Sequence, residues 1–149
     1  MLKFVIPESD ANRVNDRLIK AAKSRFAEGS LDESGLKDLV DRAVIAELRT
    51  GIPTEALLMV IDTFEAEIAK LAPEISDAVR AGDGEALKEA AHALKGASAN
   101  LGAAQVAHLS GRLEELAHVG DFDGAPALAE ELARSLRDTP AALRAELSH

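Results

Sequence analysis

The sequence predicts an all-α fold, an antiparallel up-down-up-down four-helix bundle with a short capping helix and an extra N-terminal helix. Apolar side chains recur at alternating spacings of four and three residues, which is the period of an amphipathic helix. Short connections rich in glycine and proline separate four such segments of about 15 to 28 residues. The composition is 47% apolar but only 3% aromatic, which favours helices packed through small side chains. No segment shows a credible strand pattern.

The first 30 residues are a candidate extension, and the predicted domain boundary separates residues 1–30 from the bundle at 31–149. Residues 1–30 hold six basic and four acidic side chains, whereas 31–149 hold eleven basic and twenty-two acidic ones. An arm ending at Pro7 precedes a predicted amphipathic helix over 8–27 with a basic flank. We expect this helix to pack or self-associate rather than bind a membrane surface, because its apolar face is thin.

Charge and composition exclude several functional classes. A net charge of -9 argues against nucleic acid as a ligand, because phosphate backbones need clustered lysine and arginine. The absence of cysteine excludes disulfides and thiolate metal sites. The sequence contains no run of about 18 apolar residues, the length that could span a membrane. Its first residues carry too short an apolar run for a secretory signal. We therefore expect a cytoplasmic protein, and we favour a monomer.

The first half of the predicted bundle contains a short helix and a long one. The short helix lies within residues 36–50 and ends at Gly51, and the long helix follows from Pro53 to about residue 81. Pro73 lies inside the long helix and is expected to bend or break it. Leu58 and Met59 fall off its apolar stripe, and we expect them to contact the short helix rather than remain exposed for a partner.

Three turns delimit the second half of the bundle. A turn at 81–84 precedes a helix over 85–100, and Gly102 stops that helix. The next helix ends near Gly120. Pro126 opens the last helix, which Pro140 is expected to kink or split.

The stretch AHALKGASANLG at residues 91–102 is the strongest candidate for chemistry. At about 100° per residue, His92 points away from the apolar stripe of its helix, toward solvent. Lys88 and Lys95 project on the same broad side, and Gly96 leaves bare backbone one turn after His92. An attacking imidazole needs an available ring nitrogen and room for a phosphorylated partner, and a lysine can neutralise phosphoryl oxygens. This pattern predicts that His92 is a phosphoryl acceptor.

This region resembles the histidine phosphotransfer (HPt) family of bacterial two-component phosphorelays. The family motif is His-x-Leu-Lys-Gly followed by a glycine six residues on, and it stands here as His92, Leu94, Lys95, Gly96 and Gly102. The likeness extends over about residues 36–147 through the helix order, the Leu-Glu pair at 113–114 and the acidic turn at 121–123. The resemblance implies an antiparallel four-helix bundle whose histidine takes a phosphoryl group from the aspartyl-phosphate of a receiver domain and passes it to another receiver.

The resemblance also implies a role for each site residue. His92 would be phosphorylated on Nε2, Lys95 would steady the phosphoryl group, and Gly96 would admit the partner. Glu114 occupies the place of the glutamate or glutamine that holds the other imidazole nitrogen in this family. A carboxylate there fixes the tautomer and leaves Nε2 available for attack.

The implied partners are response-regulator receiver domains, including one carried by a hybrid histidine kinase. The chain has no glycine-rich nucleotide loop and no kinase signature, so it is expected to be a phosphoryl carrier without intrinsic kinase activity. We expect no cofactor on this chain, because the magnesium ion and the aspartate needed for transfer would belong to the receiver.

Two other functions fit parts of the sequence. Glu89 with His92 and Glu115 with His118 form Glu-x-x-His pairs, the spacing found in di-iron carboxylate bundles. Those bundles direct the pairs inward, whereas helical phasing turns both pairs outward here. A helical interaction module without phosphotransfer is the second alternative, and only the joint placement of His92, Lys95, Gly96 and Glu114 argues against it.

Overall fold

The computed structural model describes residues 39–148 of the 149-residue chain, which form five α-helices. No strand occurs within residues 39–148. The predicted helix over 8–27 and the predicted domain boundary near residue 30 lie outside the described residues. The helices are α3 (Arg42–Arg49), α4 (Thr54–Ala81), α5 (Gly84–Asn100), α6 (Ala104–Val119) and α7 (Ala125–Leu147).

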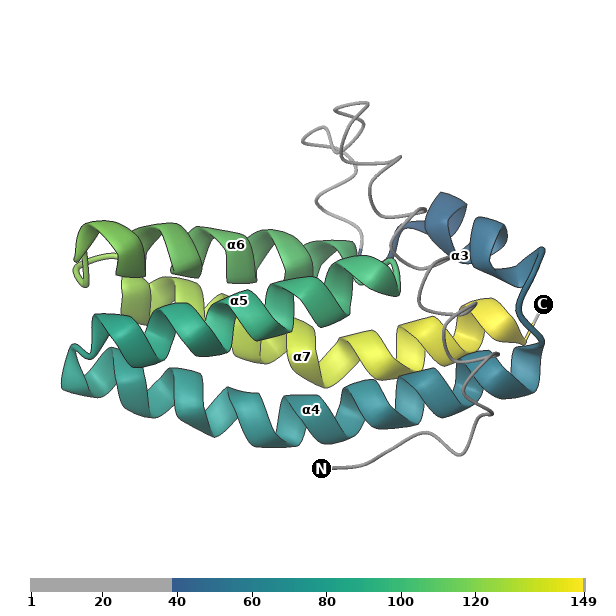
Figure 1. The fold of residues 1–149 in the computed structure, drawn as a ribbon, viewed down its shortest axis with the longest axis horizontal. Coiled ribbons are helices and arrows are strands. Elements are labelled where there is room, and N and C mark those ends of the chain that lie inside the picture. Colours follow the sequence, from purple (N-terminus) through teal and green to yellow (C-terminus); the bar gives the residue numbers. More distant parts are fainter. Residues whose placement is uncertain (1–38, 149) are drawn as a thin grey trace.

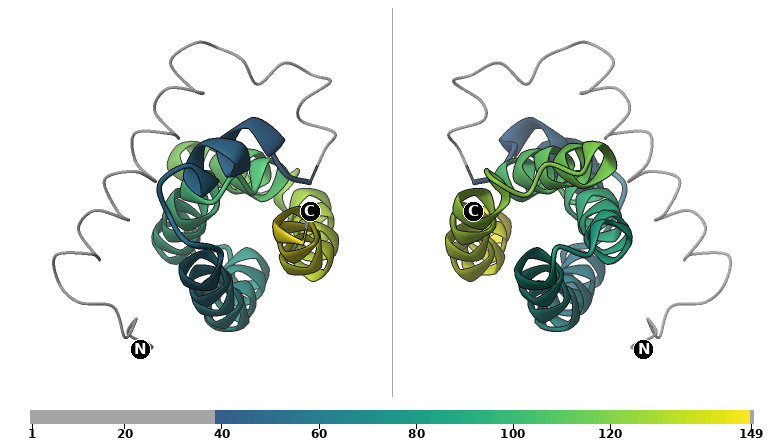
Figure 2. Two further views of the ribbon diagram at one scale, coloured as in Figure 1. Left: turned by 90° about the vertical axis from the view of Figure 1, so that its right-hand side faces the viewer. Right: turned by 90° about the vertical axis from the view of Figure 1, so that its left-hand side faces the viewer.

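Helices α4 to α7 form the predicted four-helix bundle (Figure 1). Successive helices run in opposite directions, and α4 contacts α5, α5 contacts α6, α6 contacts α7 and α7 returns to α4. The end-on views show the four helices around one common centre (Figure 2). Their buried faces follow the predicted stripes and are mostly aliphatic, with Leu57, Ile61, Phe64, Leu71, Ile75, Leu87, Leu94, Val106, Leu113, Leu132, Leu136 and Leu143 among them.

The short helix α3 caps one end of the bundle, as predicted (Figure 1). The Asp41 carboxylate accepts hydrogen bonds from the backbone N–H groups of Ala43 and Val44 and so begins the helix. Ile45 and Leu48 are buried and meet the apolar end of the bundle, which Leu57, Ile61, Leu101, Leu143 and Leu147 form. Burial of large aliphatic side chains stabilises such a contact by about 1.5–3 kcal/mol each.

The turn at Gly102 joins α5, α6 and α3. Gly102 has φ +75°, a conformation that favours glycine. A Cβ at this position would lie 3.1 Å from both the Asp41 carbonyl oxygen and the Val44 Cβ. The Asp41 N–H donates a 2.7 Å hydrogen bond to the Gly102 carbonyl. Gly102 therefore lets the start of α3 approach this turn closely.

Neither internal proline ends its helix, so a break at Pro73 and a split at Pro140 are excluded. The other outcomes expected there, a bend at Pro73 and a kink at Pro140, stay predictions. Helix α4 continues through Pro73 to Ala81, and α7 continues through Pro140 to Leu147. A proline costs about 3 kcal/mol inside a helix. Apolar side chains are buried on both sides of each proline, and their burial outweighs that cost.

The expectation that Leu58 and Met59 contact the short helix is wrong. Their exposed fractions are 36% and 37%. The space beneath α3 is taken by Leu57 and Ile61, which lie on the central stripe of α4. Because a helix turns about 100° per residue, Leu58 and Met59 point away from that stripe and toward the surface.

Candidate functional site

His92 lies near the middle of α5 and points outward. Leu87 and Leu94 of the same helix are fully buried, whereas the His92 side chain is 69% exposed. Asp83 fixes the start of α5 by accepting a hydrogen bond from the Ala86 N–H. The predicted outward orientation of His92 is confirmed, and it follows from the helical phase set by the two leucines.

Glu114 of α6 contacts the His92 imidazole directly. Its Oε2 lies 2.7 Å from His92 Nδ1, within hydrogen-bonding distance. The fully buried Leu113 anchors α6 to the core beside it, and the Glu114 side chain itself is only 19% exposed. The pair connects residues 22 positions apart, and the packing of α5 against α6 brings them together.

Lys95 contacts the same carboxylate. Its Nζ lies 2.8 Å from Glu114 Oε1, and its side chain is 42% exposed. Lys95 follows His92 by three residues, so both side chains project from one side of α5. The sequence placed Lys95 beside the imidazole, and the structure adds that Glu114 bridges the two. Lys88, which was expected on the same side, is exposed.

The electrostatics of the site keep Glu114 ionised. Partial burial raises the pKa of the Glu114 carboxyl. Hydrogen bonds from Lys95 and His92, together with the charges of these two groups, lower the pKa by more than burial raises it. The resulting pKa lies below the ordinary glutamate value. An ionised carboxylate can only accept hydrogen bonds, so Nδ1 of His92 must carry the proton in this contact. In the neutral imidazole, Nε2 then holds the lone pair.

The surface around His92 is open. Gly96 lies one turn after His92, and a Cβ built on it would meet nothing within 4 Å among the described residues. Two surface grooves, of about 280 Å³ between α4 and α7 and about 480 Å³ between α4 and α5, are not lined by any of the four site residues. The His92 imidazole therefore lies on an outer face, which suits a large partner better than an enclosed small substrate.

The two Glu-x-x-His pairs lie on the surface. Glu89, His92, Glu115 and His118 are all exposed. No group of three or more His, Cys, Asp or Glu residues within 39–148 is arranged to hold a metal ion. Within the same residues, no helix is long and apolar enough to cross a membrane.

Gly111 of α6 is a site residue that the sequence analysis did not identify. A Cβ at Gly111 would lie 3.3 Å from Cδ of Lys95. Its signal in the sequence is a glycine inside a predicted helix, where glycine costs about 0.5–1 kcal/mol relative to alanine. A glycine in the sequence does not reveal which residue packs against it. Only the packing of α5 on α6 shows that the Lys95 side chain lies beside Gly111.

Comparison with known proteins identifies the family. The Hpt domain family matches residues 59–148, which include the His92–Glu114 contact. The chain belongs to the Hpt domain family. A crystal structure of histidine-containing phosphotransfer protein B (HptB) from Pseudomonas aeruginosa PAO1 is similar, with a TM-score of 0.67 and 32% sequence identity. The likeness covers 74% of this chain and 95% of the HptB chain. A search of curated proteins gave no match.

Membership confirms the predicted fold class and the general function. Hpt domains are helical bundles that carry out histidine phosphotransfer in phosphorelays and interact with receiver domains. The resemblance drawn from the residues around His92 is therefore confirmed at the level of the family. The roles of the individual side chains follow from the geometry of this bundle and are proposed next.

Proposed function

We propose that this Hpt domain accepts a phosphoryl group on Nε2 of His92 from the aspartyl-phosphate of one receiver domain and delivers it to the aspartate of another. The 2.7 Å contact between His92 Nδ1 and Glu114 Oε2, on an otherwise exposed imidazole, carries the proposal. It orients the ring and fixes the proton on Nδ1, so the lone pair is on the outer nitrogen.

The transfer requires no proton removal before attack. The Nε2 lone pair forms a bond to phosphorus while the bond between phosphorus and the aspartate oxygen breaks, and the aspartate leaves as a carboxylate. The imidazole then bears a positive charge, which the ionised Glu114 carboxylate stabilises through the Nδ1–H donor. Transfer to the second receiver reverses these steps and restores the neutral imidazole.

Lys95 and Gly96 complete the proposed site. An ammonium group has three N–H donors, and one suffices for Glu114 Oε1. The other two are available for phosphoryl oxygens on His92, whose side chain projects from the same side of α5. The open space at Gly96 admits the receiver surface that carries the phosphoryl group.

The proposal assigns the remaining chemistry to the partners. Receiver domains, including one on a hybrid histidine kinase, would supply the aspartate and a magnesium ion that neutralises the phosphoryl oxygens. No cofactor is assigned to this chain. The similarity to HptB, a histidine-containing phosphotransfer protein, supports a phosphoryl carrier. A cytoplasmic location and a monomeric form stay predictions from the sequence.

Incubation with phosphorylated receivers tests the proposal. The wild type should acquire an acid-labile, alkali-stable phosphate, and His92→Gln should acquire none. His118→Gln is the matched control, because His118 is an exposed histidine of α6 outside the contact with Glu114, and it should label like the wild type. Labelling of His92→Gln at another histidine would refute the assignment. A wild type that binds receivers but takes no phosphate would instead indicate an interaction module.

A further inference from the structure

Gly111 is an unusual residue for its position in α6. It lies inside the helix Ala104–Val119, three residues before Glu114, and its backbone is helical rather than left-handed. A turn or a helix end therefore does not explain the glycine. Glycine weakens a helix interior relative to alanine, so another contact should account for the missing side chain.

The space beside Gly111 is occupied by the stem of Lys95. A Cβ at Gly111 would lie 3.3 Å from Lys95 Cδ, and apart from its two chain neighbours and the local α6 backbone no other described atom comes within 4 Å. The contrast with Gly102 is informative, because a Cβ there would press on the backbone of Asp41. Gly111 does not serve a close approach of two backbones, and its neighbour is a functional side chain.

We infer that Gly111 is a positioning residue for the phosphotransfer site. Its missing side chain leaves a track across α6 for the Lys95 stem, and Lys95 Nζ thereby reaches Glu114 Oε1 at 2.8 Å. This inference rests on the proposed function of His92.

The effect of Gly111 passes through both oxygens of Glu114. Oε1 accepts from Lys95 and Oε2 lies 2.7 Å from His92 Nδ1, so the two α5 side chains together fix the plane of the carboxylate. A carboxylate held by one donor can rotate about its terminal torsion, which has broad energy wells. Displacement of Lys95 therefore loosens the group that orients the imidazole.

The size of the side chain at position 111 determines the expected effect. Alanine requires Lys95 Cδ to move by only a few tenths of an ångström, which a flexible stem can do. Leucine fills the track itself and should displace the stem. Both alanine and leucine favour a helix over glycine, so loss of function and loss of stability should separate.

The test compares Gly111→Ala, Gly111→Leu and the control Gly124→Ala, which changes a glycine at the start of α7. The donor is phosphoramidate, which is too small to need receiver docking. Nε2 attacks its phosphorus, the phosphorus–nitrogen bond breaks, and ammonia leaves. Gly111→Leu should slow His92 phosphorylation about 5-fold, somewhat less than a typical loss of a supporting contact. Gly111→Ala should remain within about 2-fold and should not lower the melting temperature.

Two further measurements separate positioning from a general structural role. Nitrogen NMR of the His92 ring should show a smaller share of the Nδ1–H tautomer in Gly111→Leu, with the control unchanged. In a Lys95→Ala background, Gly111→Leu should cause no further slowing, because the stem that it displaces is already absent. If Gly111→Leu does not fold, Gly111→Met provides the same bulk without branching.

A wild-type rate and tautomer in folded Gly111→Leu would overturn the inference, and so would equal slowing with and without Lys95. Failure of the proposed function would give a different result from failure of the inference on Gly111. In that case wild-type His92 takes no phosphate from any donor, while the tautomer measurement still reports whether Gly111 positions the ring through Lys95.

Discussion

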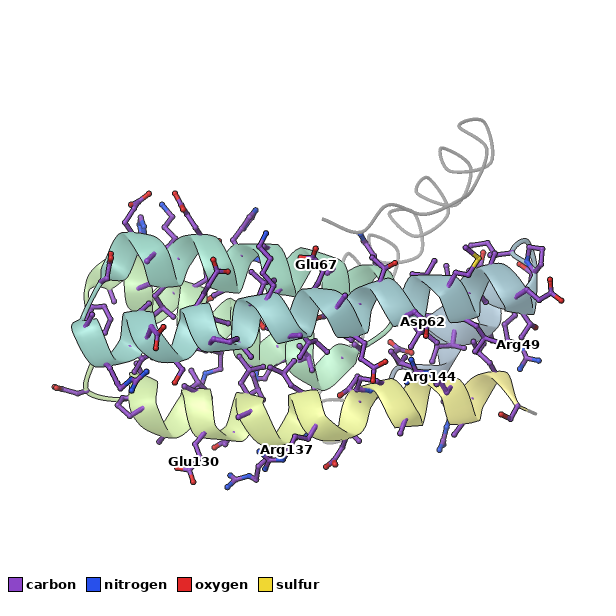
Figure 3. The ribbon with its side chains drawn as sticks, turned by 90° about the horizontal axis from the view of Figure 1, so that it is seen from below. Arg49, Asp62, Glu67, Glu130, Arg137 and Arg144 are labelled. Atoms are coloured by element: carbon purple, nitrogen blue, oxygen red, sulfur yellow. The ribbon has the colours of Figure 1, made fainter. Side chains whose placement is uncertain are left out.

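Two faces of the bundle each contain one charged side chain that bridges two others. Between α5 and α6, the Glu114 carboxylate bridges His92 and Lys95 at 2.7 and 2.8 Å. Between α4 and α7, the Arg144 guanidinium contacts Asp62 at 2.8 Å (Figure 3). It also contacts Glu65 at 2.6 Å. The two arrangements have similar distances and opposite signs of charge.

The two bridges differ in the side chains that they hold, and this difference determines which bridge could take part in chemistry. The hydrogen bonds that Arg144 donates to Glu65 and Asp62 raise its pKa, so Arg144 stays charged at any working pH. Arg144 holds two carboxylates, Asp62 and Glu65, and no imidazole takes part in this bridge. The α5/α6 bridge instead fixes an imidazole with an outward nitrogen, beside open space at Gly96. Short ion pairs alone therefore do not mark a functional site, and the proposed site differs from the α4/α7 bridge in its oriented and accessible imidazole.

Among changes to the groups around His92 and to the α4/α7 bridge, the largest effect is expected from removing the Glu114 carboxylate of the α5/α6 face. Glu114→Ala should slow phosphorylation of His92 about 30-fold, because the ring loses its orientation and its counter-charge. Glu115→Ala is the matched control, since Glu115 is an exposed neighbour outside the contact. Single-turnover transfer from a phosphorylated receiver measures both. Equal rates for the two variants would remove the proposed role of Glu114.

Removal of the cation on this face should have a smaller effect. Lys95→Ala should slow transfer about 10-fold, because the variant loses a donor to the phosphoryl group and one of the two contacts that hold Glu114. Lys70→Ala on α4 is the control and should transfer normally, with circular dichroism unchanged in both. A Lys95→Ala protein with a wild-type rate would show that the ammonium takes no part.

The α4/α7 bridge should affect stability and leave transfer unchanged. Arg144→Ala should lower the free energy of unfolding by about 1 kcal/mol, the upper range for exposed ion pairs, and the melting temperature by about 3 °C. Arg137→Ala is the control, because Arg137 lies on the outer side of α7 (Figure 3). Thermal unfolding measures the change in stability, and a phosphotransfer assay measures whether the transfer rate is unchanged. Slower transfer in Arg144→Ala would contradict the division between the two faces.

The smallest effect concerns the pH dependence of the site. The folded pKa of Glu114 lies below its unfolded value, so its stabilising contribution is complete above the unfolded value of about 4.3 and is lost as pH falls through the folded pKa. Lys95→Ala should move that pKa upward, because a lowering hydrogen bond is removed while the burial remains. Carbon NMR of the carboxyl group measures the pKa. No upward movement would show that Lys95 does not hold the carboxylate in solution.

Local rules were sufficient for most of the fold. The helical periodicity of apolar residues predicted the five described helices. It also predicted that His92 points away from the buried Leu87 and Leu94. The same local rules left open whether Pro73 bends or breaks α4, because the cost of one proline was known but the burial that offsets it was not. They failed at Leu58 and Met59, since the position of α3 at the end of the bundle depends on contacts between distant residues.

The sequence by itself determined the helices, the outward direction of His92 and, through the motif from His92 to Gly102, the resemblance to the Hpt family. These features depend on residues within a few turns of one another, where periodicity and turn chemistry act directly. The resemblance implied that Glu114 holds the imidazole of His92. Only the tertiary structure decided that the same carboxylate also binds Lys95, and that Gly111 makes room for the lysine stem. Those contacts join α5 to α6, and their distances depend on how the two helices pack, which no local pattern specifies.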